Sequence, residues 1–141
     1  ELPTPRPNVH EGYGRVDLEA LTRLAGATAF VDSRDGVATG AANEISFDLA
    51  SGKGFRATLA YTDAPASPTA GRALVNDLDL EVVTPSGRTI SLQDAKNNLE
   101  MVEFKTGQAE AGSYRIIVRG KNVPQGRNGK QPYALVVSAS E

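Results

Sequence analysis

The clearest chemical pattern in the sequence is an alternation of acidic and apolar residues between positions 77 and 83. Asp77, Asp79 and Glu81 occupy every second position, and apolar residues lie between them. A strand with this pattern buries the apolar row and turns the three carboxylates to its opposite face. Clustered carboxylates repel each other unless a cation lies among them, and their oxygens are ligands that suit Ca²⁺. The pattern therefore predicts a strand that carries a candidate calcium site.

A second oxygen-rich stretch, "QDAKNNLE", covers residues 93–100. It lies two predicted strands beyond the acidic row, and in a sandwich it could approach that row. Calcium takes six to eight oxygen ligands from carboxylates, carbonyls and amides, so one strand alone does not supply enough. The candidate ligands are Asp77, Asp79, Asp94, Asn98 and Glu100, with Asn76 next.

Two other interpretations of the acidic row remain open. The first is a solvated strand face whose carboxylates pair with cross-strand cations such as Arg115 or Lys105. The second is a paired-carboxylate acid/base site of the kind found in glycosidases. The chain contains no tryptophan to form an aromatic sugar platform, which disfavours the second interpretation.

Composition excludes several other classes of chemistry for this chain. It contains no cysteine, its single histidine is His10 in a loop-like stretch, and it has no G-x-S-x-G motif. We therefore expect neither a Ser-His-Asp triad nor a histidine or cysteine zinc site, and no enzymatic activity of the chain alone. The net charge of −2 gives no basic surplus for nucleic acid, and no apolar run approaches the roughly 20 residues of a membrane span.

The elements that must position these residues are mainly strands. One helix is predicted over residues 15–25, where Asp17 can act as the N-cap and leucines recur at helical spacing. After Gly26 the apolar period becomes two, and clusters of glycine, proline and asparagine separate short runs. These features predict an antiparallel β-sandwich or jelly roll of about eight strands, preceded by a short N-terminal helix. The predicted strands cover residues 28–31, 44–49, 55–61, 77–84, 88–92, 99–104, 113–119 and 133–139.

Several stretches together resemble one known family. The segment "NVHEGYGRVDLEAL", residues 8–21, resembles the end of the catalytic domain of subtilisin-like serine peptidases, the subtilase family. The segments "TLAYTDAP", "LVNDLDLEVVTPSG", "NNLEMVEF" and "AGSYRIIVRGKNVP" resemble the C-terminal β-barrel, or jelly-roll, domain of the alkaline, oxidation-resistant subtilases. The resemblance covers roughly residues 8–139.

The resemblance implies that the chain contains parts of two domains of a larger protein. Residues 1–26 would be the tail and last helix of a subtilase catalytic domain, and residues 27–141 a C-terminal accessory β domain. The family's catalytic aspartate, histidine and serine, and its oxyanion-hole asparagine, lie upstream of the "GYGRV" segment, so none is carried onto this chain. The resemblance also implies calcium binding and secretion to the extracellular space. The partner would be a subtilase catalytic domain on the same or a cleaved chain, acting on protein substrates.

One alternative from a different class remains. A β-sandwich of this size is also the architecture of stand-alone binding or adhesion modules that recognise protein or carbohydrate. The sequence names no ligand for such a module.

Overall fold

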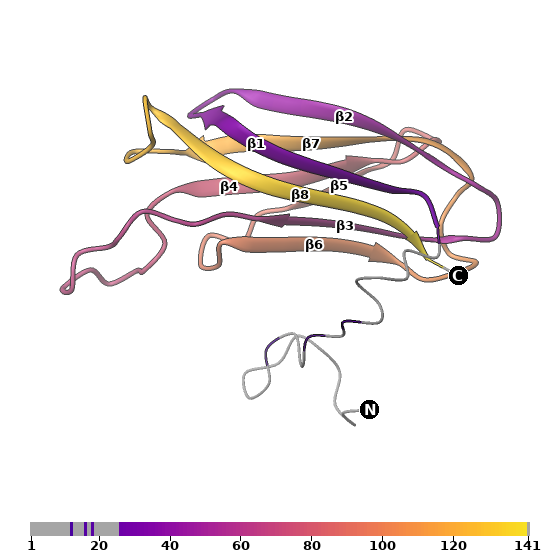
Figure 1. The fold of residues 1–141 in the computed structure, drawn as a ribbon, viewed down its shortest axis with the longest axis horizontal. Coiled ribbons are helices and arrows are strands. Elements are labelled where there is room, and N and C mark those ends of the chain that lie inside the picture. The colour runs from indigo at the N-terminus through magenta and orange to yellow at the C-terminus, as the bar shows by residue number, and fades with distance from the viewer. Residues whose placement is uncertain (1–11, 13–15, 17, 19–25, 141) are drawn as a thin grey trace.

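Alternating apolar and polar residues from position 28 onward form eight antiparallel strands in two sheets (Figure 1). The computed structural model describes residues 12, 16, 18 and 26–140. The predicted β-sandwich is confirmed for these residues, whereas the helix expected over 15–25 lies outside them apart from Val16 and Leu18. The strands are β1 Thr28–Ala38, β2 Ala42–Leu49, β3 Gly54–Ala60, β4 Asp77–Val83, β5 Thr89–Leu92, β6 Leu99–Phe104, β7 Gly112–Asn122 and β8 Lys130–Ser140.

Each sheet has four strands, and chain neighbours often lie in opposite sheets. One sheet has the order β1-β8-β3-β6 and the other the order β2-β7-β4-β5. The chain therefore crosses between the sheets at every connection except the one from β4 to β5, which stays within one sheet. The loop before β4 and the loop before β6 both belong to such crossings. This topology brings the acidic strand β4 close to the start of β6.

The core lies between the two sheets and is formed by the inward row of each strand. The rings of Phe55 on β3 and Tyr114 on β7 stack across it, with centroids 4.5 Å apart and planes at 14°. Both side chains are fully buried, so this pair joins the two sheets at the centre of the core. Leu78, Leu80 and Val82 of β4 are also fully buried, as the alternation in the sequence predicts.

The predicted strand positions are confirmed, but four strands are longer than predicted, and β2 begins two residues earlier, at Ala42. β1, β7 and β8 have eleven residues each, and β1 continues to Ala38 through a register shift between Ser33 and Val37. The "TPSG" turn before β5 forms as predicted, with Gly87 at φ 86° and its N–H donating to the carbonyl of Thr84. Within the described part of the chain, no helix has the length and apolar character needed to cross a membrane.

Candidate functional site

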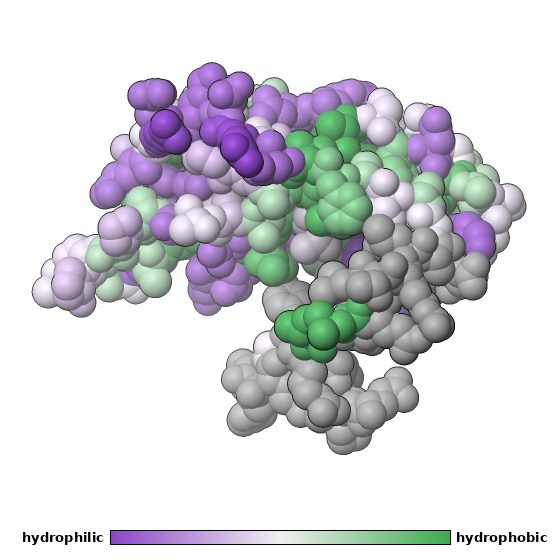
Figure 2. Space-filling view, viewed as in Figure 1, coloured by the Kyte–Doolittle hydropathy of each residue, from purple (hydrophilic) through white to green (hydrophobic). Residues whose placement is uncertain are grey.

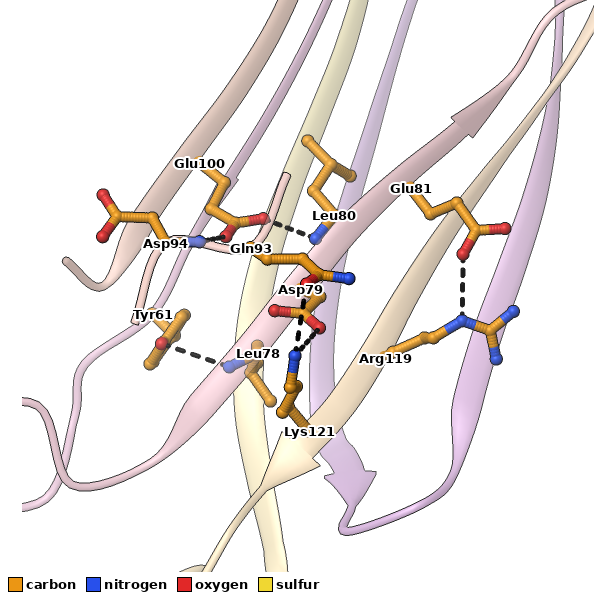
Figure 3. Close-up of polar contacts among 10 residues, drawn as sticks. All are labelled: Tyr61, Leu78, Asp79, Leu80, Glu81, Gln93, Asp94, Glu100, Arg119 and Lys121. Carbon is orange, nitrogen blue, oxygen red and sulfur yellow. Dashed lines mark hydrogen bonds and ion pairs between the residues drawn. The ribbon is translucent and has the colours of Figure 1, made fainter. Parts of the chain in front are cut away.

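The acidic row lies on the outer face of β4, opposite the core. Asp77 and Asp79 are nevertheless only 6% and 5% exposed, and Glu81 is half-buried. Glu81 accepts a hydrogen bond from Nε of Arg119 on the neighbouring strand β7 at 3.1 Å (Figure 3). Arg115, a candidate partner from the sequence, bonds Glu44 on β2 instead. The predicted shared face is confirmed, but the three acids differ in their surroundings.

An irregularity in β7 brings a cation to the acidic row. Asp77 pairs with Asn122 while Leu78 pairs with Gly120, so Lys121 is the extra residue of a β-bulge. Its Nζ lies 3.5 Å from Oδ2 of Asp79 and 3.5 Å from Oε1 of Gln93 (Figure 3). Both distances are at the outer limit of a hydrogen bond. The ammonium group therefore forms only a long, weak ion pair with Asp79.

Two carboxylate oxygens in the row have no partner. Oδ1 of Asp77 and Oδ1 of Asp79 are both buried and accept no hydrogen bond. Burial raises the pKa of Asp77, the charge of Asp79 raises it further, and Arg72 and Lys121 lower it. A buried carboxylate oxygen without a donor is costly, and a bound cation is one way to remove that cost. These two oxygens are the best evidence of a ligand-binding position among the described residues.

Glu100, one of the five candidate ligands, bonds backbone groups in two other elements. Its side chain is 2% exposed and points from β6 into the space between the sheets. Oε2 accepts the N–H of Leu80 on β4, at 2.5 Å, and Oε1 accepts the N–H of Asp94 at 2.8 Å (Figure 3). Burial raises the pKa of Glu100 to about 7, although both backbone donors oppose the shift. Both oxygens are already bonded, so Glu100 holds the crossing loop and β4 together.

The other two ligands expected from residues 93–100 also have local partners. The carboxylate of Asp94 accepts hydrogen bonds from Nδ2 of Asn97 and the N–H of Lys96, and these lower its pKa. Nδ2 of Asn98 donates to the carbonyl of Tyr61 at 2.7 Å. Among residues 26–140 and the three described positions before them, no group of three or more acidic, histidine or cysteine side chains is arranged to hold a metal ion. The five candidate ligands are therefore not brought together as one cage, and among the buried side-chain atoms that the structure describes, only Oδ1 of Asp77 and Oδ1 of Asp79 lack a hydrogen bond.

A second polar cluster, which the sequence interpretation missed, lies beside the start of β4. The hydroxyl of Tyr61 donates to the carbonyl of Asn76 and accepts the N–H of Leu78. The side chain of Asn76 is fully buried and bonds the side chain of Gln131 and both backbone groups of Gln125. This cluster joins the loops 62–76 and 123–129 to the ends of β3 and β8.

Asp63 fixes the loop 62–76 at its two ends. Its Oδ1 accepts the N–H groups of Ala64 and Asn76, and its Oδ2 accepts the N–H of Val75 at 2.7 Å. Both oxygens of this aspartate are thus engaged by backbone donors of the loop that it closes. The signal for it in the sequence is the Asp-Ala-Pro turn after a predicted strand, a pattern typical of side-chain-to-backbone bonding.

Comparisons with known proteins add no assignment. No family model and no curated protein matches the chain.

Proposed function

We propose that this chain is the C-terminal accessory β domain of a secreted subtilisin-like serine endopeptidase, with residues 1–26 belonging to the catalytic domain. The proposal rests on the sequence resemblance and on one structural observation, the convergence of the segments that carry it. The role of the domain would be to stabilise the catalytic domain and to shape access of protein substrates to it.

The segments "TLAYTDAP", "LVNDLDLEVVTPSG" and "NNLEMVEF" lie far apart in the sequence but meet in the fold. Tyr61 of the first bonds Asn76 and Leu78 of the second, and its N–H donates to the carbonyl of Asn98 in the third. Glu100 of the third bonds Leu80 of the second. Three of the five segments that carry the resemblance therefore meet at one corner of the sandwich, which supports the proposal.

The test of this function is a comparison of two proteins, the full product of the encoding gene and the chain 1–141. Casein cleavage is measured for both, with and without a serine-reactive inhibitor. We expect inhibitor-sensitive cleavage by the full product and none by the chain. If the full product is also inert, the "GYGRV" resemblance is misleading and the chain is to be treated as a binding module.

We also propose that Ca²⁺ binds at Asp77 and Asp79. The support is the pair of buried, unpartnered Oδ1 atoms, together with a lysine ammonium that contacts Asp79 and Gln93 only at 3.5 Å. Bound Ca²⁺ would supply positive charge to both carboxylates. Water would have to complete its coordination, because two carboxylates fall short of the six to eight oxygens that calcium takes. This assignment leaves out Asp94, Asn98 and Glu100, each of which has at least one side-chain hydrogen bond within the protein.

Thermal unfolding of the chain in CaCl₂ and in chelator tests the calcium proposal. A ligand that binds only the folded state stabilises it by mass action, so the chain should melt at a higher temperature in calcium. The Asp77→Asn and Asp79→Asn variants should lose this difference. Asp94→Asn is the matched control and should keep it. Identical melting curves for the unchanged chain in calcium and in chelator would overturn the proposal.

A further inference from the structure

The outer faces of both sheets carry ion pairs, but only one of them has an uncharged row that crosses all four strands. The outer face of β2-β7-β4-β5 carries cross-strand ion pairs, among them Arg115 with Glu44 and Arg119 with Glu81. The outer face of β1-β8-β3-β6 also carries an ion pair, Arg56 with Glu103, but beside it lies a row of four uncharged residues in register across all its strands. Phe30 pairs with Val136, Val136 with Thr58, and Thr58 with Met101.

Phe30 is the most unusual member of this row. Its side chain is 65% exposed, although a phenylalanine gains most of its stabilisation from burial. Val136, Thr58 and Met101 are half-buried, so they extend an apolar surface beside it. In Figure 2, hydrophobic atoms gather in the middle of the visible face, between hydrophilic groups. We call Phe30, Val136, Thr58 and Met101 the apolar row.

The path of the chain indicates what covers this row. The carbonyl of Ala27 accepts the N–H of Ala139 on β8, so the polypeptide joins this sheet immediately before β1. A Cβ atom at Gly26 would lie 2.9 Å from the carbonyl oxygen of Ala139, which keeps the entering chain close to the sheet. Phe30 follows Gly26 by only four residues. Whatever precedes Gly26 is therefore tethered beside the apolar row and has a high effective concentration there.

We propose that the apolar row is the surface on which the domain N-terminal to Gly26 docks. The inference rests on the proposed function, in which that domain is a subtilase catalytic domain ending at residue 26. The matching surface on that domain is apolar, because the row contains no charged group. Large exposed aromatic residues at the centre of a docking surface commonly carry much of its binding energy, so Phe30 is the expected anchor.

The chain contains no cysteine, which allows a direct test by thiol labelling. Three variants are made in the chain 1–141 and in the full gene product: Phe30→Cys, Val136→Cys and Thr89→Cys. Val136→Cys keeps the proposed anchor in place, so labelling reports on the native contact. Thr89 is exposed on β5 in the opposite sheet and is the matched control. Labelling rates with a maleimide are compared between the two lengths, and the unchanged proteins give the background.

In the chain 1–141 the thiols at positions 30 and 89 should label at similar rates. In the full product the thiols at positions 30 and 136 should label more slowly than in the chain by on the order of tenfold, and the thiol at 89 should not change. Equal rates in both lengths, for a full product that cleaves casein, would overturn the docking while leaving the proposed function intact. Protection already present in the chain 1–141 would also overturn it. In that case, protection that grows with concentration indicates a second copy, and constant protection indicates residues 1–25.

The labelling result also has a meaning if the full product does not cleave casein. The endopeptidase assignment then fails by the casein assay. Protection of positions 30 and 136 in that protein would show that another kind of N-terminal domain docks on the row, and the catalytic-domain docking would be overturned with the function.

Discussion

Glu100 and Leu80 belong to different sheets and are joined by a hydrogen bond. Glu100 lies on β6 and accepts the N–H of Leu80 on β4 at 2.5 Å, while its other oxygen holds the N–H of Asp94 in the loop between β5 and β6. The side chain is 2% exposed, and burial raises its pKa to about 7. One carboxyl group therefore connects both sheets and a crossing loop, in a place where its charge is poorly solvated.

The raised pKa of Glu100 predicts a pH dependence of stability. The ordinary pKa is 4.5, so between that value and about 7 the folded state binds a proton more tightly than the unfolded state. The contribution of this group to the free energy of unfolding is therefore present below pH 4.5, decreases as the pH rises to about 7, and is constant above it. We expect Glu100→Gln to remove this part of the slope in urea unfolding measured across this pH range.

Glu103→Gln is the control for that measurement. Glu103 is an exposed residue on the same strand and pairs with Arg56. It should leave the slope between pH 4.5 and 7 as it is in the unchanged chain. If the Glu100 and Glu103 variants show the same pH profile, the slope has another origin.

A second prediction concerns the hydroxyl of Tyr61. Tyr61→Phe leaves the carbonyl of Asn76 and the N–H of Leu78 without this partner in a buried position. Leaving buried polar groups unsatisfied costs about 1–3 kcal/mol of unfolding free energy, which urea unfolding would detect. Tyr133→Phe is the control, because its hydroxyl accepts a single, part-buried bond from Asn43. The cost of Tyr133→Phe should be clearly smaller, and equal costs would contradict the role given to Tyr61.

The sequence was sufficient to predict the strands but not the partners of the polar residues. Alternation alone placed Leu78 and Leu80 in the core and Asp79 on the opposite face, because the side-chain period of a strand is two. It could not show that Glu100 points inward, because the sequence does not give the register between sheets. Nor could it show that Asn76, the next candidate ligand, is buried, because its partners Gln125 and Gln131 lie about fifty residues away in the chain.

The acidic row illustrates the same limit for function. Sequence spacing grouped five oxygen-bearing residues into one calcium site, but a ligand must also have an oxygen that is free. Asp94 and Glu100 accept hydrogen bonds from nearby protein donors, and those bonds depend on how the crossing loop folds. The bulge that brings Lys121 to Asp79 has no signal in the sequence, since it arises from the pairing of β7 with β4.

Lys121 gives a third prediction, which concerns calcium. Its ammonium lies 3.5 Å from Asp79, close to where a bound cation would lie. Lys121→Met removes a competing positive charge, so we expect tighter calcium binding by calorimetry and a larger calcium-dependent rise in melting temperature. Affinity should increase with pH in both proteins, because the raised pKa of Asp77 means that a proton competes with the metal. Arg119→Met, which removes the partner of Glu81, is the control. Weaker calcium binding by Lys121→Met would contradict this placement of the ion.

A fourth prediction concerns the approach of β7 to the turn after β1. A Cβ atom at Gly120 would lie 2.2 Å from the carbonyl oxygen of Ala38, a backbone atom that cannot rotate away. Gly120→Ala should therefore lower the free energy of unfolding by about 1–3 kcal/mol, the usual cost of overpacking. Gly71→Ala is the control, because no heavy atom lies within 4 Å of its Cβ position and its φ is not positive. A stable Gly120→Ala variant would show that the two segments can separate without cost.

The two phenylalanines at the centre and on the surface of the sandwich give a final prediction. Phe55 is fully buried and stacks on Tyr114, whereas Phe30 is 65% exposed. Phe55→Ala should cost about 3–5 kcal/mol of unfolding free energy in the chain 1–141, through lost burial and the cavity left behind. Phe30→Ala should change it by no more than about 0.5 kcal/mol, as is usual for surface positions. A large cost of Phe30→Ala in the isolated chain would mean that this ring is already packed against residues 1–25. That result would contradict the proposal that the apolar row is the docking surface for another domain.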